Sequence, residues 1–315
     1  LMVEQEKKDR TYLLPQDIDV KSYVNNNPNA TGFFSDINKS QYNTLLKWKD
    51  ILKDKAIITD WVFYNDLFLL RFLRARKFEI DNTHTMFMKY INWRKDNGVD
   101  DIETYDFTEK LKIKEIYPHG YHKTDKLGRP LLFKIISQCN VDEVFTRSNE
   151  ERIMRYYIKE YERNLLYRMN CCGIKIGKIV EQSVTILCGK DLGISMYTGK
   201  VKTFTKISSN LAQDYYPEML GQMYFINTGF LFSAAWSIVS VFLDAKTTKK
   251  IVMLGSDYLT ELKKHIDMDN LPKSLGGNCE CKDIKGGCFH SDIGPWNPTG
   301  ISDLVYTPEI FDKVM

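Results

Sequence analysis

The chain has 315 residues, of which 43% are hydrophobic and 27% are charged, a balance typical of a globular protein with a sizeable core. It excludes collagen, coiled-coil and wholly disordered chains. Because 44 Lys and Arg residues stand against 41 Asp and Glu residues, the net charge is only +3, which excludes a protein that coats nucleic acid. We therefore expect no nucleic-acid partner.

The cysteine content and the N-terminal residues predict a cytoplasmic protein. Seven cysteines without regular pairing fit a reducing compartment better than a disulfide framework. Residues 1–8 are polar and charged and lack the apolar centre of a signal peptide. The longest uncharged stretch, residues 219–243, is interrupted by Gln222 and Asn227, so its apolar part, residues 230–243, is too short to span a bilayer. We expect that part to be a core helix or a helix that lies at a membrane surface.

The first part of the chain predicts a small helical unit. Residues 1–60 form a polar, Asn-rich extension with a weak helical pattern, and the helical signal sharpens over residues 61–115. From Asp66 onward, apolar side chains fill one side of a predicted helix. A second helix is predicted from about Asn82 to Asn97, and the following Gly98 is a typical helix C-terminal signal.

Residues 116–297 change to short apolar segments that alternate with amphipathic helices, and residues 298–315 form a tail. Four segments rich in β-branched or aromatic residues are predicted as buried strands: residues 131–136, 183–188, 223–227 and 251–254. Helices are predicted around residues 153–165 and over residues 201–215, the latter ending before Pro217. This alternation predicts an α/β fold with a largely parallel sheet.

The common signatures of enzymes do not occur in the sequence. It has no glycine-rich dinucleotide motif after a strand, no phosphate-binding loop that ends in Gly-Lys-Ser/Thr and no Gly-x-Ser-x-Gly nucleophile elbow. We therefore predict a protein without catalytic residues, although catalytic groups that converge from distant positions would leave no such motif.

Two groups of potential metal ligands are interpreted as ordinary residues. Cys279, Cys281, Cys288 and His290 lie within a dozen residues, but their spacing departs from that of common zinc modules, with about two to four residues between paired cysteines. We therefore predict free thiols and no metal site. His119 and His122, which flank Tyr121, are predicted as histidines of a turn at the surface rather than a catalytic pair.

Six groups of residues, in order along the chain, resemble the CRAL-TRIO lipid-binding family and most closely its yeast-type phosphatidylinositol/phosphatidylcholine transfer proteins. They are Leu69–Phe78, Trp93–Asp96, Tyr121–Lys126 with Gly128–Pro130, Tyr215–Glu218, Asn270–Pro272 with Gly276 and Gly277, and Ser291–Trp296. The resemblance extends over about residues 67–297. It implies a helical N-terminal unit followed by an α/β domain whose sheet floors an apolar pocket.

The resemblance also implies that the apolar segment 230–243 is a gate helix that closes this pocket. The residues that would face lipid or membrane are Phe230, Phe232, Trp236, Val239 and Phe242. Such a lid is physically reasonable because each CH₂ group of a fatty acyl chain is stabilised by about 0.8 kcal/mol when it leaves water.

Headgroup residues are implied position by position. The phosphatidylinositol headgroup would be held by Arg76, Glu218, Thr247 and Lys250. The two cations would neutralise the phosphodiester, while the threonine hydroxyl and the glutamate carboxylate would contact inositol. The phosphatidylcholine headgroup would be held by Tyr121, Ser183 and Thr185. A second tyrosine of the family is Leu132 here, which removes one aromatic face for the choline cation.

We therefore expect a cytoplasmic protein, peripheral to membranes, that extracts and exchanges phosphatidylinositol, and phosphatidylcholine as a second ligand, with no cofactor besides the bound lipid. We expect a monomer that contacts membranes transiently and couples to phosphoinositide signalling through a phosphoinositide kinase. The alternatives are a carrier or sensor of another hydrophobic ligand, such as a sterol, squalene or a tocopherol-like molecule, and a lipid hydrolase. Arg76 and Lys250 argue against a neutral ligand, which offers their charges nothing to neutralise.

Overall fold

A computed structural model of the chain describes residues 19–190, 192, 198–229, 236, 240 and 245–300. Its centre is a five-stranded sheet with the order β3-β4-β5-β6-β7. The strands are β3 (His119–Thr124), β4 (Pro130–Ile135), β5 (Ser183–Cys188), β6 (Leu220–Ile226) and β7 (Ile251–Met253). β3 pairs with β4 in antiparallel fashion, and the other neighbouring strands are parallel. The predicted α/β fold with a largely parallel sheet is confirmed.

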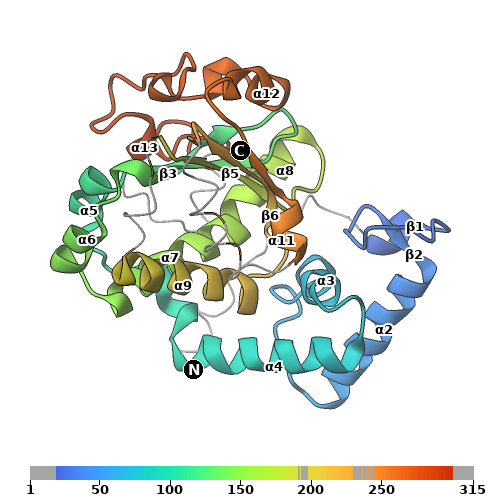
Figure 1. Cartoon of the computed structure of the whole chain (residues 1–315). Coiled ribbons are helices and arrows are strands. Elements are labelled where there is room, and N and C mark those ends of the chain that lie inside the picture. Colours follow the sequence, from blue (N-terminus) through green and yellow to red (C-terminus); the bar gives the residue numbers. More distant parts are fainter. Residues whose placement is uncertain are drawn as a thin grey trace.

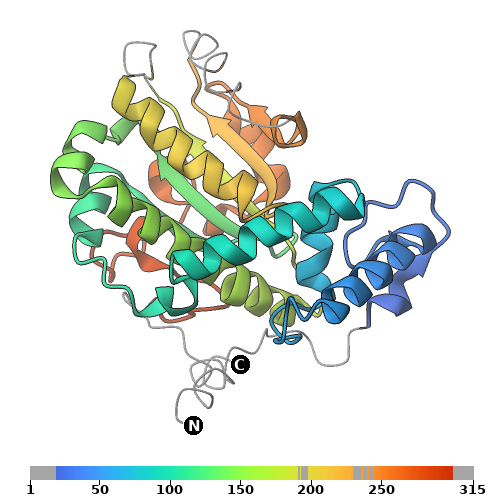
Figure 2. The same ribbon diagram turned by 90° about the horizontal axis from the view of Figure 1, so that it is seen from below.

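Helices cover both faces of this sheet (Figure 1). α7 (Glu150–Arg163) and α9 (Gly199–Asp214) lie on one face, and α12 (Tyr258–His265) and α13 (Cys288–Ser291) lie on the other. The second view shows α7 and α9 crossing in front of the strands (Figure 2). Among the described residues this domain also has the α-helices α5 (Lys110–Ile116), α6 (Val141–Arg147), α8 (Met169–Ile176) and α11 (Ala245–Lys249).

The two faces of the sheet differ in chemistry because side chains alternate along each strand. The α12 face buries Leu131, Phe133, Val184 and Ile186, which form one core with Leu262 of α12. The opposite face, which we call the α7 face, carries the alternate residues of the same strands and contains both polar and apolar side chains. It is therefore the face that could hold a ligand with two chemically different ends.

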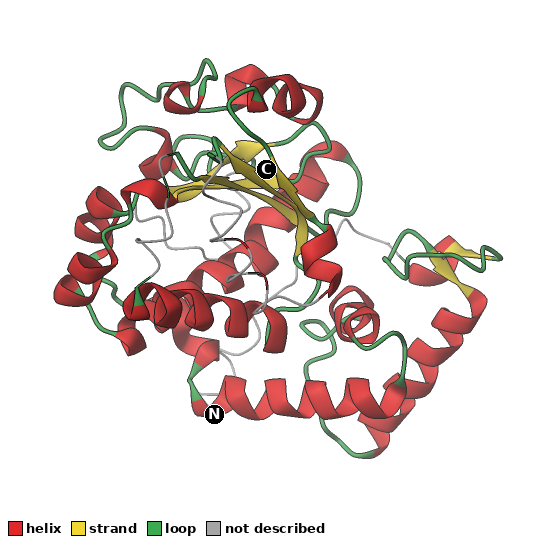
Figure 3. Ribbon diagram, viewed as in Figure 1, coloured by secondary structure: helices red, strands yellow, loops and turns green. Residues whose placement is uncertain are grey.

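The N-terminal part forms a helical arm at one side of the sheet, coloured mostly red in Figure 3. Its helices are α2 (Lys39–Asp54), α3 (Asp66–Ala75) and α4 (Ile80–Asp96), and a small parallel pair, β1 (Val24–Asn25) with β2 (Ile37–Asn38), precedes them. α2 begins with a capping box between Asn38 and Gln41. Leu45 and Trp48 of α2 are fully buried in the main apolar cluster.

α7 continues without a break into a π-helical turn, Asn164–Arg168, before α8 begins. The backbone N–H of Met169 donates to the carbonyl oxygen of Asn164, which is the five-residue spacing of a π-helix. Asn164, Leu165 and Arg168 are buried by this turn. Wide turns of this kind occur mostly as single turns inside α-helices and are frequent at functional sites.

A buried ion pair joins the helical arm to the sheet domain. Arg74 of α3 lies 2.9 Å from Glu181, and their side chains are only 3% and 6% exposed. Arg74 also donates to the carbonyl oxygen of Gly32, and Glu181 accepts the N–H of Phe34. One carboxylate thus anchors both α3 and the segment before α2.

We predict that Glu181→Gln destabilises the fold by about 3–5 kcal/mol, because the buried Arg74 loses its countercharge while the amide keeps an acceptor for Phe34. Chemical denaturation would measure the loss. The control is Asp214→Asn, which breaks a pair with Lys89 whose side chains are 41% and 54% exposed and should cost at most about 1 kcal/mol. Equal losses in the two variants would contradict the prediction.

Candidate functional site

Two of the residues predicted for the choline headgroup, Tyr121 and Thr185, lie in one row across the α7 face. The pairing register places Tyr121 beside Leu132, Leu132 beside Thr185, and Thr185 beside Met223. Ser183 precedes Thr185 on the same face, and the side chains of Tyr121, Ser183 and Thr185 are buried. The structure therefore brings these three residues together, with Leu132 between Tyr121 and Thr185 in place of the second tyrosine.

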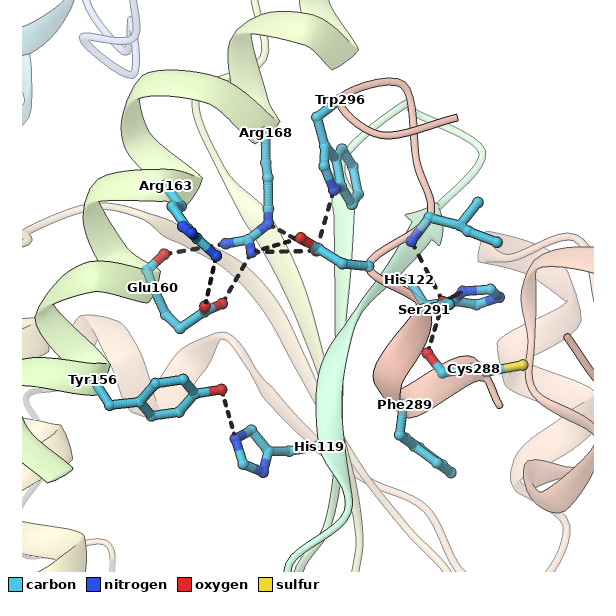
Figure 4. A network of polar contacts seen from close by, with 12 residues as sticks. His119, His122, Tyr156, Glu160, Arg163, Arg168, Cys288, Phe289, Ser291 and Trp296 are labelled. Carbon is cyan, nitrogen blue, oxygen red and sulfur yellow. Dashed lines mark hydrogen bonds and ion pairs between the residues drawn. The ribbon is translucent and has the colours of Figure 1, made fainter. Parts of the chain in front are cut away.

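Tyr121 already has a cation on one side of its ring. The guanidinium carbon of Arg168 lies 4.1 Å from the ring centroid, and Arg168 is held by Glu160 at 3.0 Å and Asp292 at 3.2 Å. Burial opposes ionisation of Glu160, but Arg168 and Arg163 outweigh it and hold the pKa of this carboxyl well below its usual range. Figure 4 shows Arg163 and Arg168 on either side of the Glu160 carboxylate. A choline cation could therefore use at most the other side of the Tyr121 ring.

Two of the four residues predicted for the inositol headgroup, Glu218 and Lys250, lie in contact where β6 and β7 begin, and Thr247 is bonded to Lys250 through its backbone. Lys250 Nζ lies 3.4 Å from Glu218 Oε2 and donates to the carbonyl oxygen of Leu220 at 2.8 Å. The Lys250 N–H donates to the carbonyl oxygen of Thr247 at 3.0 Å. Glu218 has a positive φ of 60°, a strained backbone conformation that clusters at ligand sites.

Arg76 lies apart from this group in the contacts that the structure describes. It is the C-terminal cap of α3, is half-buried, and donates from Nη1 to the carbonyl oxygen of Ala75 at 3.1 Å. The neighbouring Arg71 reaches Glu218 instead, donating to its carbonyl oxygen at 3.4 Å. Sequence reasoning missed Arg71, whose partner lies 147 positions away in the chain.

Only one of the five gate-helix residues lies among the residues that the structure describes. Trp236 is half-buried, and its ring is 5.7 Å from that of Phe225 of β6 in an edge-to-face arrangement. Phe230, Phe232, Val239 and Phe242 lie outside the described residues. Phe225 belongs to the α7 face, so Trp236 covers part of that face. No helix within the described ranges is both long and apolar enough to cross a membrane.

A lysine on the α7 face was not predicted. Lys134 of β4 lies opposite His119 of β3, and its Nζ is 5.2 Å from the ring centroid of Tyr157. Burial lowers the pKa of Lys134 to about 8. The available signal was a single charge inside the apolar strand Pro130–Ile135, where a lysine is costly unless it meets a partner or a ligand.

We predict that Lys134→Met stabilises the protein, most strongly at pH 7. The pKa of Lys134 is about 8 in the fold against about 10.5 in an unfolded chain, so burial of the charged form costs stability below pH 8. The cost disappears as pH rises from about 8 to about 10.5, where both states lose the proton. Urea denaturation of both proteins at pH 7 and pH 10 would test this, and a difference independent of pH would contradict it.

His119 and His122 are buried strand residues, so their prediction as surface turn histidines is wrong. β3 is polar in sequence and carried no strand signal, although it forms the edge of the sheet. The two rings point to opposite sides of β3 (Figure 4). His119 bonds the carbonyl oxygen of Tyr117 and the hydroxyl of Tyr156. Burial lowers the pKa of His119 to about 3 and that of His122 to about 4.

The three C-terminal cysteines cluster with His122 and not with His290, the histidine that lies near them in the sequence. The donor atoms of four residues lie within 4.8 Å of one another: His122, Cys279, Cys281 and Cys288. We call this set the thiol–imidazole group. His290 is not a member because its ring packs on Gly286, where a Cβ would come within 2.2 Å of Nδ1.

Comparison with known families identifies this combination of an α/β sheet and a helical arm. The CRAL/TRIO domain matches residues 114–277, more than half of the chain, and the CRAL/TRIO N-terminal domain matches residues 41–89. The chain belongs to the CRAL-TRIO family.

Within this family the chain is similar to Sec14 proteins. It is 40% identical to the Sec14 cytosolic factor of Schizosaccharomyces pombe over 277 residues, which covers 87% of this chain and 94% of that protein. It is 36% identical over 245 residues to the phosphatidylinositol/phosphatidylcholine transfer protein SFH11 of Arabidopsis thaliana, covering 78% and 65% of the two chains. The crystal structure of Sfh5 has the same fold, with a TM-score of 0.61 at 18% identity, covering 88% of this chain and 96% of Sfh5.

Proposed function

We propose that this chain binds phosphatidylinositol and exchanges it between membranes without breaking a bond. The observation that carries the proposal is the pair of Glu218 and Lys250 where β6 and β7 begin, with Thr247 three residues before Lys250. This group offers one cation, one hydroxyl and one carboxylate, which is the set needed for a phosphodiester joined to a polyol. Membership of the CRAL-TRIO family supports the same function.

Lys250 can exchange its ion pair with Glu218 for one with a ligand at a small cost in free energy. Its ion pair with Glu218 is long, at 3.4 Å, and the two side chains are 24% and 11% exposed, so solvent and a ligand can reach the ammonium group. A phosphodiester would replace Glu218 as the countercharge, and the released carboxylate would accept hydrogen bonds from inositol hydroxyls. The strained backbone at Glu218 keeps this carboxylate beside Lys250.

The acyl chains would lie along the apolar part of the α7 face. Leu187 and Phe225 form an apolar cluster there, and Met223, Trp236 and Ile251 pack against it. The protein retains a lipid in such a place only if its apolar side chains shield the acyl chains from water as well as the interior of the bilayer did. The segment around Trp236 would act as the gate, opening at a membrane and closing over the chains.

Several finer features belong to the same proposal. The protein would work in the cytoplasm as a monomer and contact membranes transiently, with Lys249 and Lys250 next to anionic headgroups. It would accept phosphatidylcholine as a weaker second ligand through Tyr121, Ser183 and Thr185. Delivery of phosphatidylinositol to a phosphoinositide kinase would couple exchange to signalling.

We predict that Lys250→Ala lowers phosphatidylinositol transfer between vesicles about 10- to 150-fold, because a charge-assisted contact is worth about 1.5–3 kcal/mol, and leaves phosphatidylcholine transfer nearly unchanged. The matched control is Lys263→Ala, an exposed lysine of α12 on the far side of the sheet, which should keep both activities. Labelled lipid should be recovered chemically intact after transfer. An equal loss of transfer activity for both lipids in Lys250→Ala would contradict the headgroup assignment, and any hydrolysis product would contradict the proposed function.

We predict that Leu132→Tyr raises phosphatidylcholine transfer several-fold. A tyrosine at this position would stand between Tyr121 and Thr185 and supply a ring whose face is not taken by Arg168, worth about 0.5–2 kcal/mol to a choline cation. Leu132→Phe is the control for the phenolic hydroxyl, since it supplies the ring alone. An unchanged rate in both variants would show that a missing aromatic face does not limit choline binding.

A further inference from the structure

The thiol–imidazole group has the size of a tetrahedral metal site. Cys279 Sγ and Cys281 Sγ are 3.7 Å apart, and Cys281 Sγ and Cys288 Sγ are 3.6 Å apart. His122 Nε2 is 3.3 Å from Cys279 Sγ. A zinc ion with Zn–S bonds of about 2.3 Å and tetrahedral angles would hold its sulfurs about 3.8 Å apart. The observed separations are close to this value.

Hydrogen bonds around His122 fix the tautomer that a metal ligand requires. Ser291 Oγ donates to the carbonyl oxygen of Cys288 at 3.0 Å, so its single proton is used. It must then accept from His122 Nδ1, 2.8 Å away, and this nitrogen carries the ring proton. Nε2 is therefore left with a lone pair directed at the sulfurs. Figure 4 shows His122, Ser291 and Cys288 together on the side of β3 opposite to His119.

A lysine supplies the charge that three thiolates would need. Lys123 Nζ lies 3.3 Å from Cys279 Sγ and donates to the carbonyl oxygen of Asp269 at 2.7 Å. Three thiolates and one divalent cation leave a net charge of −1, which the ammonium group of Lys123 would neutralise. His122 and Cys288 are buried, so a charged cluster without metal would be costly here.

We propose that the thiol–imidazole group binds one zinc ion as a structural site. Four protein ligands fill the tetrahedral coordination of zinc, so no position is open for a substrate. Sulfur and imidazole ligands favour zinc over calcium and magnesium, which take oxygen ligands. Binding releases one proton from each of the three thiols, and His122 keeps its Nδ1 proton. The ion would tie the loop before α13 to β3, the edge strand of the sheet.

Elemental analysis of the purified 315-residue chain tests the proposal. We expect one zinc per chain, and loss of most of it in Cys281→Ser and in Cys288→Ser. Cys139→Ser is the matched control because Cys139 is a free thiol outside the group, and this variant should keep its zinc. Absence of zinc, iron in its place, or equal zinc in all variants would overturn the proposal.

A second measurement needs no variant and so does not depend on their folding. Thiols of the native chain would be counted with a thiol reagent before and after treatment with a zinc chelator. We expect three additional reactive thiols to appear as zinc is released, together with a lower melting temperature. An unchanged thiol count would overturn the site, as would an intact mass two hydrogens lower that reveals a disulfide within the group.

Discussion

Buried arginines that need a carboxylate decide how the helical arm and the sheet domain fit together. Arg74 of α3 reaches Glu181, and Arg94 of α4 reaches Glu162 of α7 at 2.9 Å. Glu162 also accepts the hydroxyl of Tyr216 at 2.7 Å, just before the strained Glu218. An unpaired buried charge is far costlier than a paired one. Each pair therefore favours the single position of the helical arm on the sheet domain in which the arginine meets its carboxylate. The position of Glu218 beside Lys250 depends on that docking.

The α7 face then becomes a surface with two chemistries. Its central part is apolar around Phe225, the start of β6 and β7 carries the group of Glu218 and Lys250, and the β3 edge carries Tyr121 against Arg168. A phospholipid has the same division between hydrocarbon and headgroup. The residues proposed for the two headgroups come close together where β6 begins, because Ser183 pairs with Leu220, whose carbonyl oxygen accepts from Lys250, whereas Tyr121 lies at the far β3 edge.

The sequence could predict the elements whose burial shows in their own residues, and not the contacts that join distant segments. The strand of residues 183–188 was evident from its apolar, β-branched composition and is confirmed as β5. β3 was missed because its histidines and lysine hide a strand that alternates between two buried surfaces. His122 could not be assigned to the cysteines because 157 positions separate it from Cys279. Arg76 and most of the gate segment stay predictions.

The number of residues in the π-helical turn Asn164–Arg168 sets the rotation of α8 relative to α7. Removing one residue here would restore a regular α-helix and rotate α8 by about 100° relative to α7. Arg168 would then leave the ring of Tyr121 and the carboxylate of Asp292 together. A one-codon deletion in this stretch should therefore be tolerated far less than most single amino-acid exchanges, and related chains that lack the extra residue must arrange this corner of the sheet in another way.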